Sequence, residues 1–215
     1  MPSDLRTLSS AFATYVGLFP YDQRRWFRRC YASVQRTVHG GLRRSVRREL
    51  RSRLFDGVAR LEALPVEREA FERWHDELLD EVRACSGLRL GQAQKLINLL
   101  LKYHYAYLHA GRDLAWAARH QHIDALSPFF HVPIDVYVLV RLRREYRYPL
   151  VALNGAQTYA TLRVGGRHVA WSRLAEHAPY THVQAFIRDL IADRATYASP
   201  LHFEMCELWV PPRGA

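Results

Sequence analysis

Apolar residues recur every three to four positions through most of the first 110 residues, and this spacing constrains the fold more than any other feature. Such spacing gathers the apolar side chains on one face of an α-helix. The pattern predicts four helices, over residues 4–17, 22–38, 42–62 and 66–85, separated at Pro20, Gly40–Gly41 and Pro65. We therefore expect a mainly α-helical fold.

A tight hairpin is predicted directly after the fourth helix. Gly87 suits the left-handed backbone conformation that ends many helices, and the apolar pattern resumes at Leu90 or Gly91. The chain from residue 66 to about 109 is therefore predicted to form a helix, a hairpin and a second helix.

The rest of the chain is predicted to be less regular. The pattern indicates a short helix at about 113–120, a helix from Pro133 with Asp135 near its start, a small β-hairpin over 159–171, a helix at about 180–195 and an irregular tail. We expect a single domain over 1–215, or two packed helical subdomains, 1–62 and 63–148, against which 149–215 packs back.

Several classes of protein are excluded by composition. No uncharged run of about 18 residues occurs and no signal-peptide pattern opens the chain, so we expect no membrane segment. The three cysteines are far apart and odd in number, which suits reduced thiols in the cytoplasm and supplies no four-cysteine metal site. We expect a monomer that uses no metal and no cofactor.

Positive charge is concentrated near the N-terminus. The net charge is +10, and residues 1–60 carry 13 arginines against four acidic residues. Many of these arginines are spaced so that they form two stripes, each on one helix. The stripes are either a surface for a polyanion such as nucleic acid or a solvated face. For the first interpretation, the expected phosphate contacts are Arg24, Arg28, Arg43, Arg44, Arg47 and Arg48.

Lysine is almost absent from this sequence. Lys95 and Lys102 are the only two lysines, against 29 arginines. Residues seven apart on a helix differ by about 20° in direction, so both amines face the same space. They either extend from a buried helix and pair with carboxylates, or they do chemistry that arginine cannot do. An amine can lose its proton and attack an electrophile, whereas a guanidinium cannot.

Lys95 is the better candidate for a nucleophile. An attacking amine must be neutral, and burial together with a nearby helix N-terminus disfavours the charged form of lysine. Lys95 lies near the start of an apolar helix and meets both conditions.

The hairpin, the helix that carries Lys95, and a later Val132-Pro133-Ile134-Asp135 sequence together resemble the helix-hairpin-helix DNA glycosylases. Lys102, two turns after Lys95, is similar to a second lysine in the archaeal-type 8-oxoguanine glycosylase branch. The resemblance covers about residues 66–145. It implies that Lys95 attacks C1′ of a flipped nucleotide, that Asp135 stabilises the developing cation, and that the hairpin, with Arg89 and Gly91, binds a DNA phosphate.

The same resemblance implies a pocket for the flipped base. Its expected residues are Lys102, Asn98, Leu99, His104 and Trp209. Leu99 occupies the position where the archaeal branch has an aromatic residue, so two substrates remain open. These are 8-oxoguanine and a hypermodified phage pyrimidine such as glucosylated hydroxymethylcytosine.

We predict a DNA glycosylase, with associated lyase activity, that excises a modified base from double-stranded DNA, in repair or in phage defence. The alternative is a noncatalytic helical protein that binds nucleic acid, in which both lysines are structural or phosphate contacts.

Overall fold

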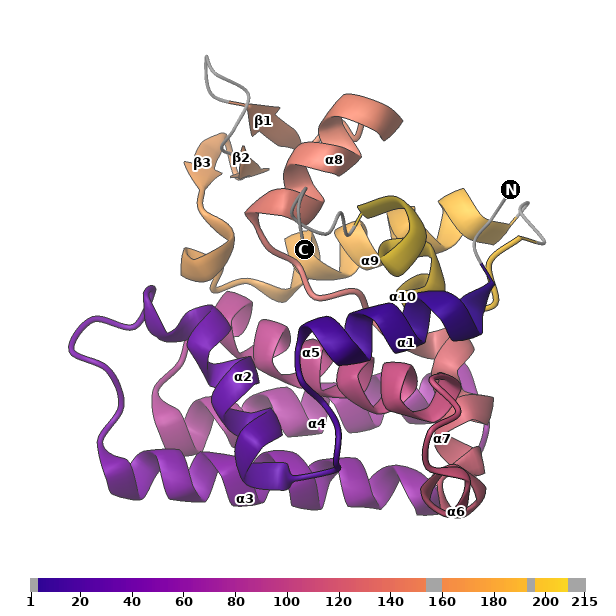
Figure 1. Ribbon diagram of the computed structural model, residues 1–215. Helices are drawn as coiled ribbons and strands as arrows, with labels where there is room; N and C mark the ends of the chain where they lie inside the picture. The colour runs from indigo at the N-terminus through magenta and orange to yellow at the C-terminus, as the bar shows by residue number, and fades with distance from the viewer. Residues whose placement is uncertain (1–3, 154–159, 193–195, 209–215) are drawn as a thin grey trace.

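The protein is mainly α-helical with one small antiparallel sheet, as the sequence predicts, and Figure 1 shows the sheet at one edge of the layered helices. The computed structural model describes residues 4–153, 160–192 and 196–208. The helices of the N-terminal half are α1 (Leu5–Tyr15), α2 (Gln23–Gln35), α3 (Arg44–Arg60), α4 (Arg68–Ser86) and α5 (Leu90–His109). Their ends lie within a few residues of the predicted ones.

Helix α5 lies at the centre of the molecule. It packs against α1, α2 and α4, and a 3-10 turn, η3 (Trp171–Arg173), contacts it as well. From Leu90 to Tyr107 every residue of α5 is buried except Leu99, which is partly exposed. Even so, no helix in the described ranges is long and apolar enough to span a membrane. The polar side chains of α5 must find partners inside the protein, because an unpaired polar group is costly to bury.

The hairpin between α4 and α5 has the predicted left-handed glycine. Gly87 has a φ of 68°, and its N–H donates to the carbonyl oxygen of Arg83 over 2.8 Å. Gly91, in the first turn of α5, lies against the backbone of η3. A Cβ atom at Gly91 would sit 1.7 Å from the carbonyl oxygen of Trp171, so only glycine permits this contact.

The segment before α8 (Val136–Tyr146) is extended. The sequence predicted that a helix starts at Pro133. In the structure Asp135 is the N-cap, with a φ of −144°, and α8 starts at Val136. The Asp135 side chain accepts from the backbone N–H groups of Tyr137 and Val138 over 2.9 and 3.1 Å. Such a cap satisfies amides that have no partner within the helix, which explains why α8 starts there.

The predicted β-hairpin is present and gains a third strand. Strand β2 (Ala160–Val164) pairs antiparallel with β3 (Arg167–Val169) across Gly165 and Gly166, which both have positive φ. Strand β1 (Val151–Leu153) pairs with the other edge of β2. A strand of three residues is too short to show an alternating pattern, so β1 could not be predicted from the sequence.

The C-terminal part is more helical than the sequence predicted. It contains α9 (His177–Ala192), α10 (Pro200–Phe203) and a π-helical turn, η4 (Glu204–Leu208). Two short helices precede α8, namely α6 (Leu114–Arg119) and α7 (Gln121–Leu126). Ser199 caps α10 by accepting from the N–H of His202 over 3.1 Å, and Pro200 stands in its first turn. The prediction of an irregular tail was therefore wrong for residues 200–208.

Candidate active site

The structure brings Lys95 and Asp135 into direct contact. Lys95, in the second turn of α5, donates a hydrogen bond from Nζ to Oδ2 of Asp135 over 3.0 Å. The Lys95 side chain is 10% exposed and that of Asp135 is 20% exposed. The pair is therefore largely desolvated and still reachable from solvent.

The Asp135 carboxylate has a fixed orientation. Its Oδ1 accepts from the two N–H groups at the start of α8, while Oδ2 faces Lys95. The N-terminus of a helix carries a partial positive charge that stabilises a carboxylate there. Asp135 is thus a preorganised anion with one oxygen directed at the amine.

Two glutamine side chains fix the extended segment that ends at Asp135. Gln94 of α5 donates to the carbonyl oxygen of Ile134 over 2.9 Å and accepts from its N–H over 3.2 Å. Gln184 of α9 makes the same two bonds to Val132, over 2.8 and 2.9 Å. Neither glutamine was predicted from the sequence.

An aromatic ring borders the pair. The ring centroid of Trp171 lies 4.7 Å from Lys95 Nζ, a distance at which a ring attracts an ammonium group. Tyr137, two residues after Asp135, contacts the Asp135 carboxylate through its backbone N–H, and its side chain is 74% exposed. Neither residue was assigned to the site from the sequence.

Lys102 has a different environment from Lys95. It forms an ion pair with Glu204 of the π-helical turn, and the two side chains are 2% and 6% exposed. Its Nζ also lies 4.3 Å from the ring centroid of Phe12. Burial lowers the pKa of Lys102 and raises that of Glu204, although each partner opposes the shift of the other. The prediction that Lys102 faces an open base pocket is thereby corrected.

Asn98 is also part of the interior. It is fully buried, and its amide nitrogen donates to the Tyr180 hydroxyl over 2.9 Å and to Gln94 Oε1 over 3.1 Å. Its oxygen lies 2.9 Å from Nε2 of His75. With these bonds made, Asn98 supports Gln94 and does not offer its amide to a base.

His104 lies on the opposite side of α5. Nine residues after Lys95 the helix has turned by about 180°, and the expectation of a shared pocket overlooked this rotation. His104 packs among Trp26 and Trp116, with ring centroids 5.0 and 5.5 Å away. Burial lowers its pKa to about 3, so it is neutral at pH 7.

Of the other expected pocket residues, Leu99 alone is placed where it can meet a ligand. It lies on the same stripe of α5 as Lys95 and is partly exposed. Trp209 lies outside the described residues.

A buried polar network lies behind the extended segment. His131 Nδ1 lies 2.7 Å from the Tyr180 hydroxyl, and its Nε2 lies 3.1 Å from a carboxylate oxygen of Glu72. Burial lowers the pKa of His131 to about 4, so the ring is neutral at pH 7. The network joins α4 and α9 to residues 131–132 and supports the backbone that leads to Asp135.

The residues expected to bind the DNA backbone divide into two groups. Exposed side chains are found at Arg24, Arg28, Arg43, Arg44, Arg47, Arg48 and Arg89. Gly91 is different, because its N–H donates to the carbonyl oxygen of Leu174 over 3.1 Å. Its amide is therefore not available to a phosphate, which corrects that prediction.

Within the described residues, no group of three or more His, Cys, Asp or Glu side chains is arranged to hold a metal ion. No protein-family model, no curated protein and no solved structure matches this chain.

Proposed function

We propose that the protein is a DNA glycosylase with lyase activity that uses Lys95 as its nucleophile. The observation that carries this proposal is the contact between Lys95 Nζ and Asp135 Oδ2, which are 3.0 Å apart and partly open to solvent. A lysine and a carboxylate in contact are the two groups needed to displace a base through a Schiff base.

The proposed reaction begins with proton transfer from the Lys95 ammonium to Asp135. The neutral amine forms a bond to C1′ of the flipped nucleotide, while the bond from C1′ to the base breaks. The base leaves with the electron pair and takes up the proton held by Asp135, so the carboxylate becomes negative again. That negative charge stabilises the positive charge on the sugar. The C1′–O4′ bond then breaks as a proton passes from the Lys95 nitrogen to O4′, which gives the Schiff base between Lys95 and C1′. Removal of a C2′ proton forms a C2′–C3′ double bond and breaks the bond from C3′ to the 3′ phosphate, which leaves with the electron pair.

The environments of the two lysines distinguish their roles. Lys102 and Glu204 are almost fully buried, so their ion pair is inaccessible to a sugar. Breaking a buried ion pair costs several kcal/mol, about 3–5 in measured cases, which gives Lys102 a structural role. Lys95 alone combines an accessible amine with an oriented carboxylate.

The proposed substrate is a modified base that leaves the duplex and lies against Leu99, which is partly exposed on the Lys95 stripe of α5. Base flipping is required because C1′ cannot be attacked within a stacked helix. Leu99 is smaller and less planar than an aromatic platform, so the two candidate bases remain 8-oxoguanine and a hypermodified pyrimidine. Release of one base from a panel of modified duplexes would decide between them.

The test of the proposed function is covalent trapping. Wild-type protein incubated with abasic duplex DNA and borohydride should give a protein–DNA adduct, because reduction fixes the Schiff base. Lys95→Arg should fold and bind DNA yet give no adduct, since charge is retained and nucleophilicity is lost. Lys102→Arg is the matched control. An adduct that persists in Lys95→Arg and disappears in Lys102→Arg would assign the nucleophile to Lys102.

The second candidate is a noncatalytic protein that binds nucleic acid. It is favoured by the exposed arginines of α2 and α3, which need no chemistry to bind phosphates. Salt-dependent DNA binding without an adduct on any modified or abasic duplex would support it against the glycosylase.

A further inference from the structure

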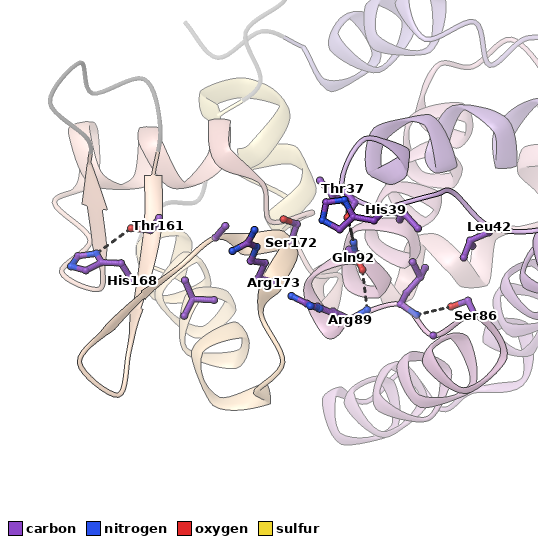
Figure 2. A pocket seen from close by; sticks show the side chains of 15 residues that line it. Thr37, His39, Leu42, Ser86, Arg89, Gln92, Thr161, His168, Ser172 and Arg173 are labelled. Carbon is purple, nitrogen blue, oxygen red and sulfur yellow. Dashed lines mark hydrogen bonds between the residues drawn. The ribbon is translucent and has the colours of Figure 1, made fainter.

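A polar cleft of about 920 Å³ lies between the hairpin and the small sheet. One wall comes from the α2–α3 loop and the hairpin, with Thr37, His39 and Arg89, and the other from β3 and η3, with His168 and Arg173. Figure 2 shows the Arg89 side chain extending from the hairpin toward the wall that carries Arg173. Three segments far apart in the sequence thus contribute basic side chains to one space.

The charges of this cleft are not neutralised by the protein. No Asp or Glu is among the described residues that line it, and within the described chain neither Arg89 nor Arg173 forms an ion pair. Both arginines are exposed. Two guanidinium groups that face one cleft without a carboxylate favour a ligand that carries more than one negative charge.

The cleft begins within one helical turn of the candidate active site. Gln92 lines it three residues before Lys95, and Gln92 Nε2 donates to the carbonyl oxygen of Thr37 over 2.8 Å. On the other wall, Ser172 and Arg173 line the cleft while the ring of their neighbour Trp171 faces Lys95. The start of α5 and η3 therefore flank both Lys95 and the cleft.

We propose that this cleft binds the sugar–phosphate backbone of the DNA strand that continues from the nucleotide at Lys95, with Arg89 and Arg173 each contacting a phosphate. The inference rests on the proposed function for the identity of the strand as DNA. Arg89 was expected from the sequence to bind a phosphate, whereas the assignment of η3, through Arg173, to substrate binding was not.

The first test measures salt dependence. Equilibrium binding to a fluorescent duplex with a nonreactive abasic analogue should give a slope of log affinity against log salt. The slope should become shallower by about 0.9 for each phosphate that is no longer bound, hence by about 1.8 in Arg89→Gln/Arg173→Gln. The matched control is Arg119→Gln, an exposed arginine of α6 outside the cleft, which should leave the slope unchanged. An unchanged slope in the double variant would overturn the proposal.

The second test locates the strand. Trimming the duplex on one side of the abasic analogue should weaken wild-type binding, whereas trimming the other side should not. On the sensitive side, the trimmed duplex should bind wild type and the double variant equally. Equal sensitivity on both sides would contradict the proposed path.

Competitors identify the ligand class. An oligonucleotide should compete far better than a deoxynucleoside monophosphate. Equal competition by the two would show that the cleft binds a mononucleotide. Tighter binding of RNA than of DNA would assign the cleft to RNA. Either result overturns the proposal. The salt-slope measurement requires no reaction. It therefore tests whether the cleft binds DNA phosphates even if wild-type protein gives no borohydride adduct and the proposed function fails.

Discussion

Two lysines that look equivalent in the sequence have different partners. Both lie on one stripe of α5, yet Lys95 meets Asp135 near the surface and Lys102 meets Glu204 in the interior. The first partner was expected from the resemblance to the helix-hairpin-helix glycosylases, which assigns Lys95 and Asp135 to one site. The second was not, because Glu204 belongs to a tail whose helical turn has no clear sequence signal.

Replacing Asp135 by Asn should separate chemistry from folding. Asn caps a helix about as well as Asp, so α8 keeps its cap; losing the ion pair with Lys95 should cost less than the loss of a fully buried pair, because both side chains are partly exposed. The charge that stabilises the cationic sugar is lost, and the single-turnover rate of base release should fall by about 10²-fold or more. DNA affinity, measured in parallel, should be unchanged or higher. An unaltered rate would remove Asp135 from the mechanism.

Replacing Lys102 by Met should destabilise the protein in a pH-dependent way. It leaves Glu204 buried without its partner, at a cost of about 3–5 kcal/mol near neutral pH. Burial raises the pKa of Glu204 above its ordinary value of 4.5, so the folded variant binds a proton that the unfolded chain releases. Its unfolding free energy should therefore fall as pH rises above about 4.5.

The measurement is urea denaturation across this pH range. Lys102→Met/Glu204→Gln is the control, since it has no buried carboxyl group and should lose this pH dependence. If Lys102→Met and the double variant show the same pH profile, Glu204 does not titrate as described.

At the scale of elements, local signals were predictable and distant partnerships were not. The α4–α5 hairpin follows from Gly87, whose left-handed conformation ends α4 by a rule that acts within a few residues. The extended segment before Asp135 follows no such rule. Its backbone is satisfied by side chains of Gln94 and Gln184, which lie on two helices distant in sequence. No single-sequence pattern encodes that pairing.

Gly91→Ala should disturb both stability and the site. The added Cβ would meet the Trp171 carbonyl oxygen at 1.7 Å, so η3 must move, at a cost of about 1–3 kcal/mol. Because the Trp171 ring lies against Lys95, borohydride trapping should also slow.

Gly87→Ala is the control: its φ is strained, but no atom lies within 4 Å of the added Cβ. It should lose some stability and keep its trapping rate. Equal trapping in both variants would contradict a role for the η3 contact.

At the scale of the whole molecule, the arginines of α3 follow directly on a segment that lines the polar cleft. The polar cleft includes His39 and Leu42, and the arginines of α3 begin at the next residue, Arg43. Figure 1 shows that the α2–α3 loop leads from the region of the hairpin to the start of α3. The basic stripe of α3 therefore starts directly after a residue that lines the cleft. The charge pattern was predictable from sequence, whereas its connection to the cleft depends on how distant segments pack.

The arginines at the start of α3 are placed against the helix dipole. Arg43 is the N-cap, Arg44 and Arg47 follow within four residues, and the first turn has no acidic residue. A cation at a helix N-terminus is unfavourable and an anion there is favourable, each by about 0.3–1 kcal/mol. Changing Arg43, Arg44, Arg47 and Arg48 to Glu should therefore maintain or raise the melting temperature.

If these arginines bind DNA phosphates, the same variant should weaken binding to all sequences alike. The slope of log affinity against log salt should become shallower by about 0.9 for each phosphate that is no longer bound. On that hypothesis, opposite effects on folding and on binding are expected, because the arginines would bind the ligand at a cost to the stability of the helix. A raised melting temperature with an unchanged salt slope would show that the stripe is only a solvated face.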